Sequence, residues 1–366
     1  MKILLHLFLV LLPVTACSQR NAPAMQDYTQ PYTRSSLIAD VMADPAFGDF
    51  GHLLLPVNTS YWSGTTLEDL RLTWYNGIDP DKTVEIVNYL KDHAVAGEQV
   101  FFRIYTEAEM LADPEKRDVG LFFFRAQNTQ ERKPFAICNA GGGHVYVGAM
   151  HDSYPHALEI AKKGYNAFAL IYRPDWDTSD EDLARAITFV CDHADALGVQ
   201  ATDYSLWGGS AGARMAADFS QLSHLRSSTG RNDIPQAAAC IMQYTGYSTV
   251  ATDYAPTYAN CGKNDGIASW QGMQNRLNQL SAYGIPTEFH AYDGLPHGFG
   301  LGTGTVAQGW TNDAIRFWEA LMSGTTGIEN VHSAAFDGKR YNLQGQQVGE
   351  DYRGIVIQNG QKQVIQ

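Results

Sequence analysis

The sequence predicts an α/β fold, in which a mostly parallel sheet of the eight-stranded type carries helices on both faces. Three observations predict this fold. From about residue 100 onward, short apolar runs alternate with amphipathic segments. The spacing of apolar residues changes repeatedly from the period of a strand to that of a helix. One apolar run also leads through a Gly-x-Ser-x-Gly sequence directly into a segment with helical spacing.

The strand-like runs are short, apolar and bounded by glycine, proline or polar residues. They cover residues 100–105, 119–125, 135–138, 167–172, 204–207, 237–244, 256–260 and 287–292. The helical segments cover residues 155–163, 180–197, 213–222, 267–283 and 307–322. We expect Ser179 to cap the start of the second helix and Gly198 to end it. Ahead of the sheet, Asp79-Pro80-Asp81 indicates the start of a further helix.

The first residues have the pattern of an export signal. Lys2 precedes an apolar run over residues 3–14, which is too short to span a bilayer. The following Val14-Thr15-Ala16-Cys17 resembles the lipobox of bacterial lipoproteins, where the signal is cut before an acylated cysteine. We predict a signal peptide over residues 1–16, lipid attachment at Cys17, and an exported protein anchored to a bacterial membrane, on its periplasmic side or at the cell surface. A plain secretory signal with an incidental cysteine is the alternative.

The rest of the chain divides into four parts by composition and pattern. Residues 17–35 are polar and irregular and form a tether. Residues 36–99 form an N-terminal extension that could act as a lid, and residues 100–323 form the domain with the sheet. Residues 324–366 form a small β appendage with a tight Asn359-Gly360 turn. This tail loosely resembles the C-terminal sorting domains of type IX secretion, and an appendage without a transport role explains it equally well.

Charge and cysteine spacing exclude several kinds of ligand. A formal net charge of −13 repels a polyanion, so nucleic acid is not expected as a partner. The cysteines beyond Cys17 show no metal-ligand spacing, and we predict no metal and no cofactor. Cys138 and Cys240 lie in apolar runs, as buried thiols do, while a Cys240–Cys261 disulfide is left open. Nothing in the sequence indicates an oligomeric state.

The segment over residues 204–222 carries the strongest chemical signal. A strand, the sequence Gly208-Gly209-Ser210-Ala211-Gly212 and a helix form the pattern of a nucleophile elbow, which exposes a serine hydroxyl at a tight turn. Gly208 and Gly212 leave room for the adjoining backbone, and the N-terminus of the helix favours developing negative charge. We predict that Ser210 is a nucleophile, with an ordinary glycine-rich turn as the alternative.

A serine hydroxyl is a weak nucleophile and needs a general base. In proteins with this elbow an acid and then a histidine follow the serine along the chain. His297 lies in a glycine-rich loop just after the last strand-like run, and we predict that it is the base. His290 lies inside that run and His332 lies in the tail, so both fit the role less well.

The supporting acid is expected in the loop after the strand-like run 256–260. Asp265 occupies that loop, and we predict that it holds the imidazole in the required tautomer and stabilises the imidazolium. Asp293 and Asp253 are the rivals. Asp293 stands only four positions before His297, and Asp253 precedes the strand.

Backbone N–H groups are expected to bind the oxyanion that forms during attack. The amide of Ala211, the residue after the predicted nucleophile, should supply one of them. The loop Gly141-Gly142-Gly143 follows a strand-like run and precedes a helix, where glycines let the backbone approach a substrate. A flexible turn is the alternative interpretation of these glycines.

Together these elements resemble the esterase and lipase branch of the α/β-hydrolase superfamily, in particular carboxylesterases with a His-Gly-Gly-Gly motif and carbohydrate acyl esterases. The resemblance covers about residues 100–322 and implies the α/β-hydrolase fold. It also implies that Gly142 and Gly143 are the loop donors. The chain departs from the pattern at Ala140, where histidine or proline is usual, and at His144, where an aromatic residue is usual.

The predicted reaction is hydrolysis of a carboxylic ester through an acyl-enzyme on Ser210. Residues 244–256 leave little room for the large cap that many lipases of this superfamily carry, so we expect an open site. The family resemblance and the predicted export imply short or aromatic acyl groups, such as acetyl or feruloyl, on carbohydrates or other small molecules. Tyr146, Trp176 and His144 are expected as substrate contacts on the oxyanion side, although core packing would explain the aromatic residues equally well.

Two other functions are compatible with the same core. A serine peptidase of the prolyl-oligopeptidase type shares it, but such enzymes carry a β-propeller, and the N-terminal part here is too short and lacks blade repeats. A non-catalytic surface binding protein with a hydrolase fold would not need the complete set of serine, acid, histidine and glycine-rich loop.

Overall fold

The computed structural model describes residues 27–55, 59–75, 77–129, 131–322, 340–342, 347–349, 353–358 and 361–365. The chain separates into two compact units, Met1–Pro31 and Tyr32–Gln366. The predicted signal peptide and Cys17 lie outside the described residues. In the part of the chain that is described, no helix has the length and hydrophobicity needed to cross a membrane.

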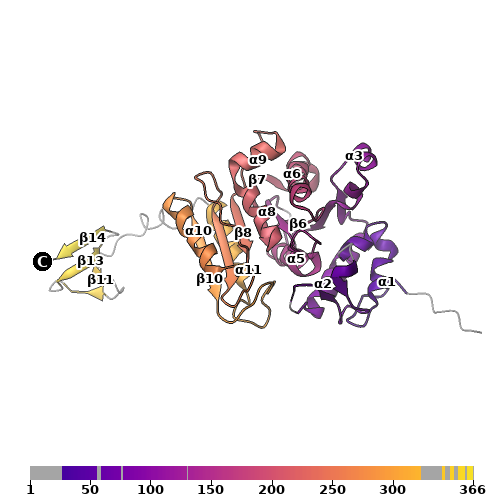
Figure 1. Ribbon diagram of the computed structural model, residues 1–366, viewed down its shortest axis with the longest axis horizontal. Coiled ribbons are helices and arrows are strands. Elements are labelled where there is room, and N and C mark those ends of the chain that lie inside the picture. Colours follow the sequence, from indigo (N-terminus) through magenta and orange to yellow (C-terminus); the bar gives the residue numbers. More distant parts are fainter. Residues whose placement is uncertain are drawn as a thin grey trace, which may run out of the picture. The chain divides into compact units, whose positions relative to one another are not determined.

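An eight-stranded sheet forms the centre of the second unit (Figure 1). Its strands run in the order β10-β9-β8-β7-β5-β6-β4-β3. They are β3 (Phe101–Arg103), β4 (Gly120–Phe124), β5 (Pro134–Asn139), β6 (Asn166–Ile171), β7 (Gln200–Gly209), β8 (Ala239–Gln243), β9 (Thr257–Gly262) and β10 (Thr287–Tyr292). Strands β5 to β10 pair in parallel, whereas β4 pairs antiparallel with β3 and β6. The predicted mostly parallel sheet is confirmed.

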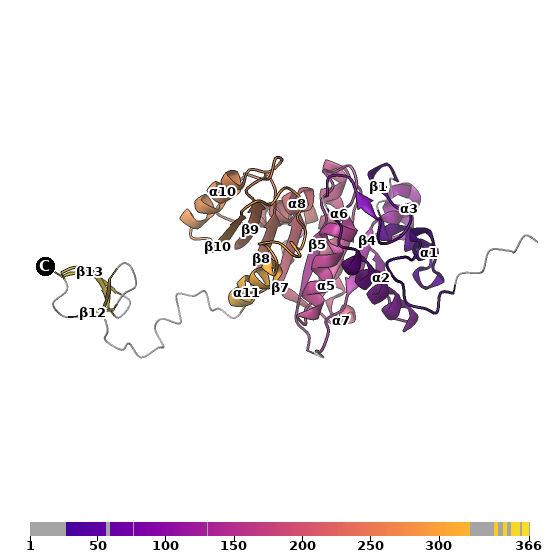
Figure 2. The ribbon, with the colours of Figure 1, turned by 90° about the horizontal axis from the view of Figure 1, so that it is seen from below.

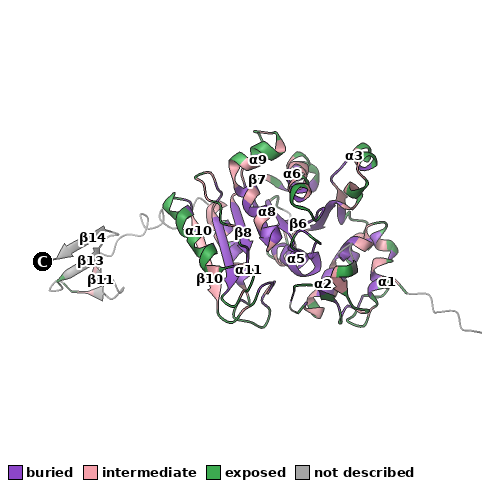
Figure 3. Ribbon diagram, in the orientation of Figure 1, coloured by how far each residue is buried: buried purple, intermediate pink, exposed green. Residues whose placement is uncertain are grey.

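Helices cover both faces of this sheet, also as predicted (Figure 2). Helices α5 (Tyr154–Lys162) and α11 (Trp310–Met322) lie on one face, and α6 (Trp176–Asp192), α8 (Ala211–Ser220) and α10 (Trp270–Ala282) lie on the other. Helix α9 (Leu222–Thr229) packs on α6 and α8. Figure 3 shows that the central strands are buried, while the helices have both buried and exposed residues. This is the burial pattern of a parallel sheet between two helical layers.

The start of α6 differs from the prediction. Asp175, not Ser179, is the N-cap, and its carboxylate accepts a hydrogen bond from the Asp177 N–H at 3.0 Å. Ser179 lies buried within the first turns of the helix, where its hydroxyl donates to the Trp176 carbonyl at 3.2 Å. The helix therefore starts earlier than its apolar periodicity indicated, because the aspartate offers the stronger acceptor. Gly198, in a left-handed conformation, ends the short helix α7 (Ala194–Leu197) that follows α6.

The N-terminal segment packs into the same core as the sheet. It contains α1 (Ile38–Met42), the short strands β1 (Trp62–Ser63) and β2 (Arg71–Leu72), and α2 (Pro80–Val95). Asp79 caps α2 by accepting hydrogen bonds from the N–H groups of Asp81 and Lys82, as its position before Pro80 predicts. Between the two segments, the ring of Phe50 stacks on that of Phe101 with their centroids 5.3 Å apart.

The C-terminal strands form a separate antiparallel sheet in the order β12-β11-β13-β14. These strands are β11 (Arg340–Asn342), β12 (Gln347–Val348), β13 (Gly354–Gln358) and β14 (Gln361–Ile365). Gln358 pairs with Gln361, which brackets the predicted Asn359-Gly360 turn, itself outside the described residues. The sheet agrees with the predicted β appendage, and its role in transport stays a prediction.

Among the described residues all four cysteines are free, so no Cys240–Cys261 disulfide is present. Cys138 and Cys240 are buried, as their apolar surroundings in the sequence predicted.

Candidate active site

Ser210 lies at a tight turn between β7 and α8. Its backbone angles, φ 52° and ψ −115°, are rarely adopted by residues other than glycine and indicate stored strain. A Cβ atom at Gly208 would lie 2.2 Å from the carbonyl group of Gly212, and one at Gly212 would lie 2.1 Å from the carbonyl oxygen of Asn139. The two glycines therefore allow the close backbone contacts that form the turn.

Ser210, His297 and Asp265 form a continuous chain of hydrogen bonds. The Ser210 hydroxyl lies 2.9 Å from His297 Nε2, and His297 Nδ1 lies 2.8 Å from Asp265 Oδ2. Because a carboxylate only accepts, Nδ1 carries the proton and Nε2 is free to accept the serine proton. The structure thus brings together three residues that lie far apart in the sequence.

The environment of Asp265 keeps its side chain ionised. Burial by itself would raise the pKa of this carboxyl group, but the hydrogen bond to His297 and those from the N–H groups of Ala268 and Ile267 lower the pKa below its usual value. The thiol of Cys261 lies 3.7 Å from Asp265 Oδ2. The carboxylate is therefore held in a fixed orientation as a base partner for the imidazole.

The rival residues have other partners. Asp293 is exposed and forms an ion pair with Lys263 at 2.9 Å. Asp253 accepts a hydrogen bond from the Ser223 N–H, at the start of α9. His290 lies in β10 and contacts Glu288 at 2.6 Å. His332 lies outside the described residues.

The glycine-rich loop after β5 lies beside Ser210. Gly143 and Ala211 line the same pocket as Ser210 and His297, whereas Gly142 is buried and is not part of the pocket surface. Both loop glycines have positive φ angles, 130° at Gly142 and 64° at Gly143. Within the described residues neither their N–H groups nor that of Ala211 donates to another protein atom. Of these N–H groups, those of Gly143 and Ala211 belong to residues that line the pocket, where a bound oxyanion could accept from them.

The pocket over Ser210 is an open groove of about 420 Å³. The chain between β8 and β9 lines much of it, through residues 244–249, and Ile267 and Trp176 lie at its margins. This connection forms a wall of the groove and does not form a large cap, in agreement with its short length.

The predicted substrate contacts have different positions. Trp176 is 58% exposed, and its ring lies 4.2 Å from the ring of His144 and 4.7 Å from the Arg214 guanidinium. Tyr146 is only 1% exposed and donates its hydroxyl to the carbonyl of Thr73. The prediction that Tyr146 offers a surface to substrate is wrong, because core packing covers its ring.

His144 borders the groove as an uncharged imidazole. Burial, reinforced by the positive charge of Arg214, lowers its pKa to about 4. Nδ1 lies 3.3 Å from the Ser179 hydroxyl, and Nε2 is buried with no hydrogen-bond partner among the described residues. His144 therefore has one unused polar atom beside the predicted oxyanion loop.

Trp74, an aromatic residue of the N-terminal extension, is half-exposed, and its ring would lie 3.2 Å from a Cβ atom at Gly143. Sequence reasoning missed two other residues near Ser210, Tyr244 and Asp152. Tyr244 is buried, with its ring centroid 5.0 Å from that of His297. The Asp152 carboxylate accepts a hydrogen bond from the Gly141 N–H in the glycine-rich loop. The one signal in the sequence was that Asp152 closely follows the glycine-rich loop. The other contacts join residues far apart in the chain and leave no local pattern.

Metal ligands do not gather at this site. No group of three or more His, Cys, Asp or Glu side chains suited to a metal ion occurs among the described residues.

Comparisons with known proteins extend the description of the fold. The family model described as BD-FAE matches residues 121–256, which is less than half of the chain. The match includes the glycine-rich loop and Ser210 and ends before Asp265 and His297. No curated protein matches the chain in sequence.

Solved structures match the chain at low sequence identity. An acetyl ester-xyloside bifunctional hydrolase from Caldicellulosiruptor lactoaceticus is 19% identical, with a TM-score of 0.51, over 62% of this chain and 96% of that protein. A thermophilic esterase from Thermogutta terrifontis, with propionate bound, is 20% identical, with a TM-score of 0.49, over 57% of this chain and 90% of that one. The strand order and the first of these similarities show that the chain has the α/β-hydrolase fold.

Proposed function

We propose that the protein is a serine esterase that hydrolyses carboxylic esters through an acyl-enzyme. The observation that carries this proposal is the hydrogen-bonded chain from Asp265 through His297 to Ser210, with separations of 2.8 and 2.9 Å. A binding protein without catalytic activity would have no need for this alignment or for the strained backbone at Ser210.

In the proposed mechanism Ser210 Oγ attacks the ester carbonyl carbon while His297 Nε2 takes the hydroxyl proton. The oxyanion accepts hydrogen bonds from the N–H groups of Ala211 and Gly143, with Gly142 as a further donor. The imidazolium then protonates the leaving alcohol. Water, activated by the same imidazole, attacks the acyl-enzyme and releases the acid. Asp265 holds the imidazole and stabilises its charged form.

We propose short or aromatic acyl groups on carbohydrates as the substrate class. The groove is open, and the exposed face of Trp176, which lines it, is suited to contact a sugar or phenyl ring. Half-exposed Trp74 lies beside Gly143, another lining residue, and offers a second aromatic surface nearby. The similarity to a hydrolase described as acting on acetyl esters supports the same class.

The first test compares the purified protein with its Ser210→Ala variant on p-nitrophenyl acetate. We expect the variant to lose activity by on the order of 10⁶, since the nucleophile is removed. A fluorophosphonate probe should label only the protein with Ser210. Activity that survives in the variant, or an unlabelled Ser210 in a protein without activity, would refute the serine-esterase proposal. Hydrolysis of aminoacyl anilides but not of esters would instead favour a peptidase.

We also propose that the protein is exported and acylated at Cys17, which lies outside the described residues. The full chain expressed in a Gram-negative bacterium should incorporate labelled palmitate and sediment with membranes. Cys17→Ser should abolish the label. A labelled Cys17→Ser variant, or an unlabelled unaltered chain, would contradict acylation at this residue.

A further inference from the structure

A buried carboxylate joins the glycine-rich loop to the elbow. Asp152, the last residue of α4 (Ala149–Asp152), is 1% exposed. Its Oδ2 accepts hydrogen bonds from the Gly141 N–H at 2.8 Å and from the Tyr75 hydroxyl at 2.9 Å. A Cβ atom at Gly209, next to Ser210, would lie 2.3 Å from each carboxylate oxygen. The carboxylate thus lies directly between the predicted oxyanion loop and the nucleophile turn.

The same carboxylate also reaches the histidine through a tyrosine. The Tyr244 hydroxyl donates to Asp152 Oδ1, and the Tyr244 ring packs edge to face against His297. Tyr244 has a φ angle of 35°, which is unusual for a large side chain, so the hydrogen bond helps to fix a strained residue. Movement of Asp152 would therefore release both the loop and one face of the imidazole.

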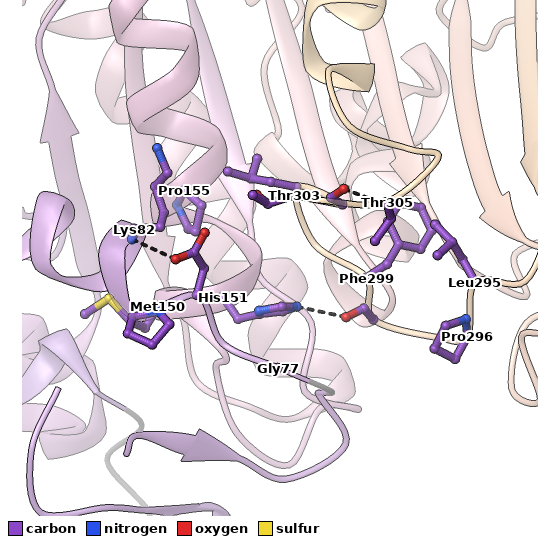
Figure 4. A pocket seen from close by; sticks show the side chains of 15 residues that line it. Gly77, Lys82, Met150, His151, Pro155, Leu295, Pro296, Phe299, Thr303 and Thr305 are labelled. Carbon is purple, nitrogen blue, oxygen red and sulfur yellow. Dashed lines mark hydrogen bonds between the residues drawn. The ribbon is translucent and has the colours of Figure 1, made fainter. Parts of the chain in front are cut away.

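The neighbouring side chain holds the loop of His297 directly. His151 Nε2 lies 2.9 Å from the carbonyl oxygen of Gly298, the residue after His297. Since a carbonyl only accepts, Nε2 carries a proton. Burial lowers the pKa of His151, so the imidazole is neutral. Figure 4 shows His151, beside Met150, pointing toward the loop that carries Pro296 and Phe299. These residues line a cavity of about 340 Å³.

We infer that Asp152 and His151 are positioning residues that fix the oxyanion loop and the His297 loop relative to each other. Asp152 acts through Gly141 and Tyr244, and His151 acts through Gly298. Neither lines the groove over Ser210, so neither contacts the substrate there. The inference rests on the proposed serine-esterase function, because it assigns how that site keeps its geometry.

This role predicts a loss of turnover without a loss of binding. Transition-state stabilisation depends on donors and base held to within fractions of an ångström, whereas ground-state binding in an open groove does not. Asp152→Asn keeps the shape of the side chain, but its amide NH₂ group is a donor. It would replace one of the two oxygens that now accept from the Gly141 N–H and from the hydroxyls of Tyr75 and Tyr244. We expect it to lower kcat by about 10- to 100-fold, with KM for p-nitrophenyl acetate within about threefold of the unaltered value.

A matched control separates positioning from stability. Asp182 in α6 is also fully buried, and its carboxylate accepts hydrogen bonds from the Tyr105 hydroxyl and from Arg173. Asp182→Asn should lower the unfolding midpoint at least as much as Asp152→Asn, because it breaks an ion pair as well. Under conditions well below both unfolding midpoints, Asp182→Asn should keep kcat within about twofold of the unaltered value, since Asp182 does not contact the site.

Milder variants keep the inference testable if Asp152→Asn does not fold. Tyr244→Phe removes one donor but leaves the ring against His297, and it should lower kcat by a smaller factor. His151→Gln can still donate to the Gly298 carbonyl and should retain more turnover than His151→Leu, which cannot. This order should hold in the rate of fluorophosphonate labelling of Ser210 as well.

The outcomes distinguish the two proposals. If the unaltered protein hydrolyses esters but Asp152→Asn and Tyr244→Phe turn over as fast as Asp182→Asn, the positioning role is refuted and the esterase stands. A rise in KM with unchanged kcat in these two variants would also refute the positioning role. If the unaltered protein is inactive and Ser210 is not labelled, the esterase proposal itself fails.

Discussion

The Asp265 carboxylate accepts hydrogen bonds from two backbone N–H groups and from His297, and its pKa is lowered as a result. Replacement by asparagine would keep the shape of the side chain but change what it offers to His297. An amide group that donates to Nδ1 leaves the proton on Nε2, so the imidazole could no longer accept a proton from Ser210.

We predict that Asp265→Asn lowers kcat by about 10⁴-fold, as loss of the correct tautomer does in comparable triads. Steady-state kinetics on p-nitrophenyl acetate would measure this effect. Asp293→Asn is the control, because Asp293 is exposed and pairs with Lys263. A variant at Asp265 that retains a tenth of the activity would show that another acid supports His297.

At the residue scale, functional residues that belong to a local motif could be predicted from the sequence. Residues whose role depends on contacts between distant segments could not. Ser210, Asp265 and His297 each follow a strand, and the ends of parallel strands meet at one edge of a sheet. Tyr244 also directly follows a strand, β8, and Asp152 ends helix α4. Their roles depend on a hydrogen bond between residues 92 positions apart, which leaves no pattern in the sequence. Tyr146 shows the converse, since an aromatic residue near a site is as often core as surface.

Among the elements, the strands could be predicted better than the helix ends. Every expected strand occurs. Central strands such as β4 are buried along their whole length and stand out in the sequence as continuous apolar runs. Helix α6 begins at Trp176 because the Asp175 side chain accepts a hydrogen bond from the Asp177 N–H, which has no partner within the helix. Apolar periodicity carries no information on such caps, so the boundary had to come from the structure.

Glycines in neighbouring elements should respond in opposite ways to substitution. Gly212 packs against β5, and its Cβ atom would lie 2.1 Å from the Asn139 carbonyl oxygen. Gly272, in the first turn of α10, is exposed, and its Cβ atom would lie 3.5 Å from its closest neighbour, an ordinary contact. An added methyl group would therefore displace backbone at Gly212. At Gly272 it would only reduce the conformational freedom of the unfolded chain.

We predict that Gly212→Ala unfolds at lower urea concentration and loses most activity, because the elbow must move. Gly272→Ala should raise the free energy of unfolding by up to about 1 kcal/mol, as alanine is favoured over glycine in a helix. Urea unfolding monitored by tryptophan fluorescence would measure both variants. Equal stability of the two would contradict the close packing of Gly212 against β5.

For the whole molecule, several buried imidazoles link stability to pH. Burial lowers the pKa of His144, His151 and His156. An unfolded chain binds a proton to each of them near pH 6.5, while the folded protein binds it only at lower pH. The unfolded state therefore holds more protons in that range, and the free energy of unfolding should fall as the pH falls below about 6.5. Asp180 and Asp182, whose pKa values burial raises, oppose this loss at lower pH.

His144 allows this linkage to be tested at one residue. Its pKa of about 4 predicts that it contributes about 2 kcal/mol to the difference in unfolding free energy between pH 8 and pH 5. His144→Asn should remove that contribution, since asparagine does not titrate and tolerates the positive φ angle of 56° at this position. Urea unfolding at the two pH values would measure the difference. If His144→Asn retained the full difference, the pKa of His144 would be the same in the folded and unfolded protein, and burial would not hold this imidazole uncharged beside the predicted oxyanion loop.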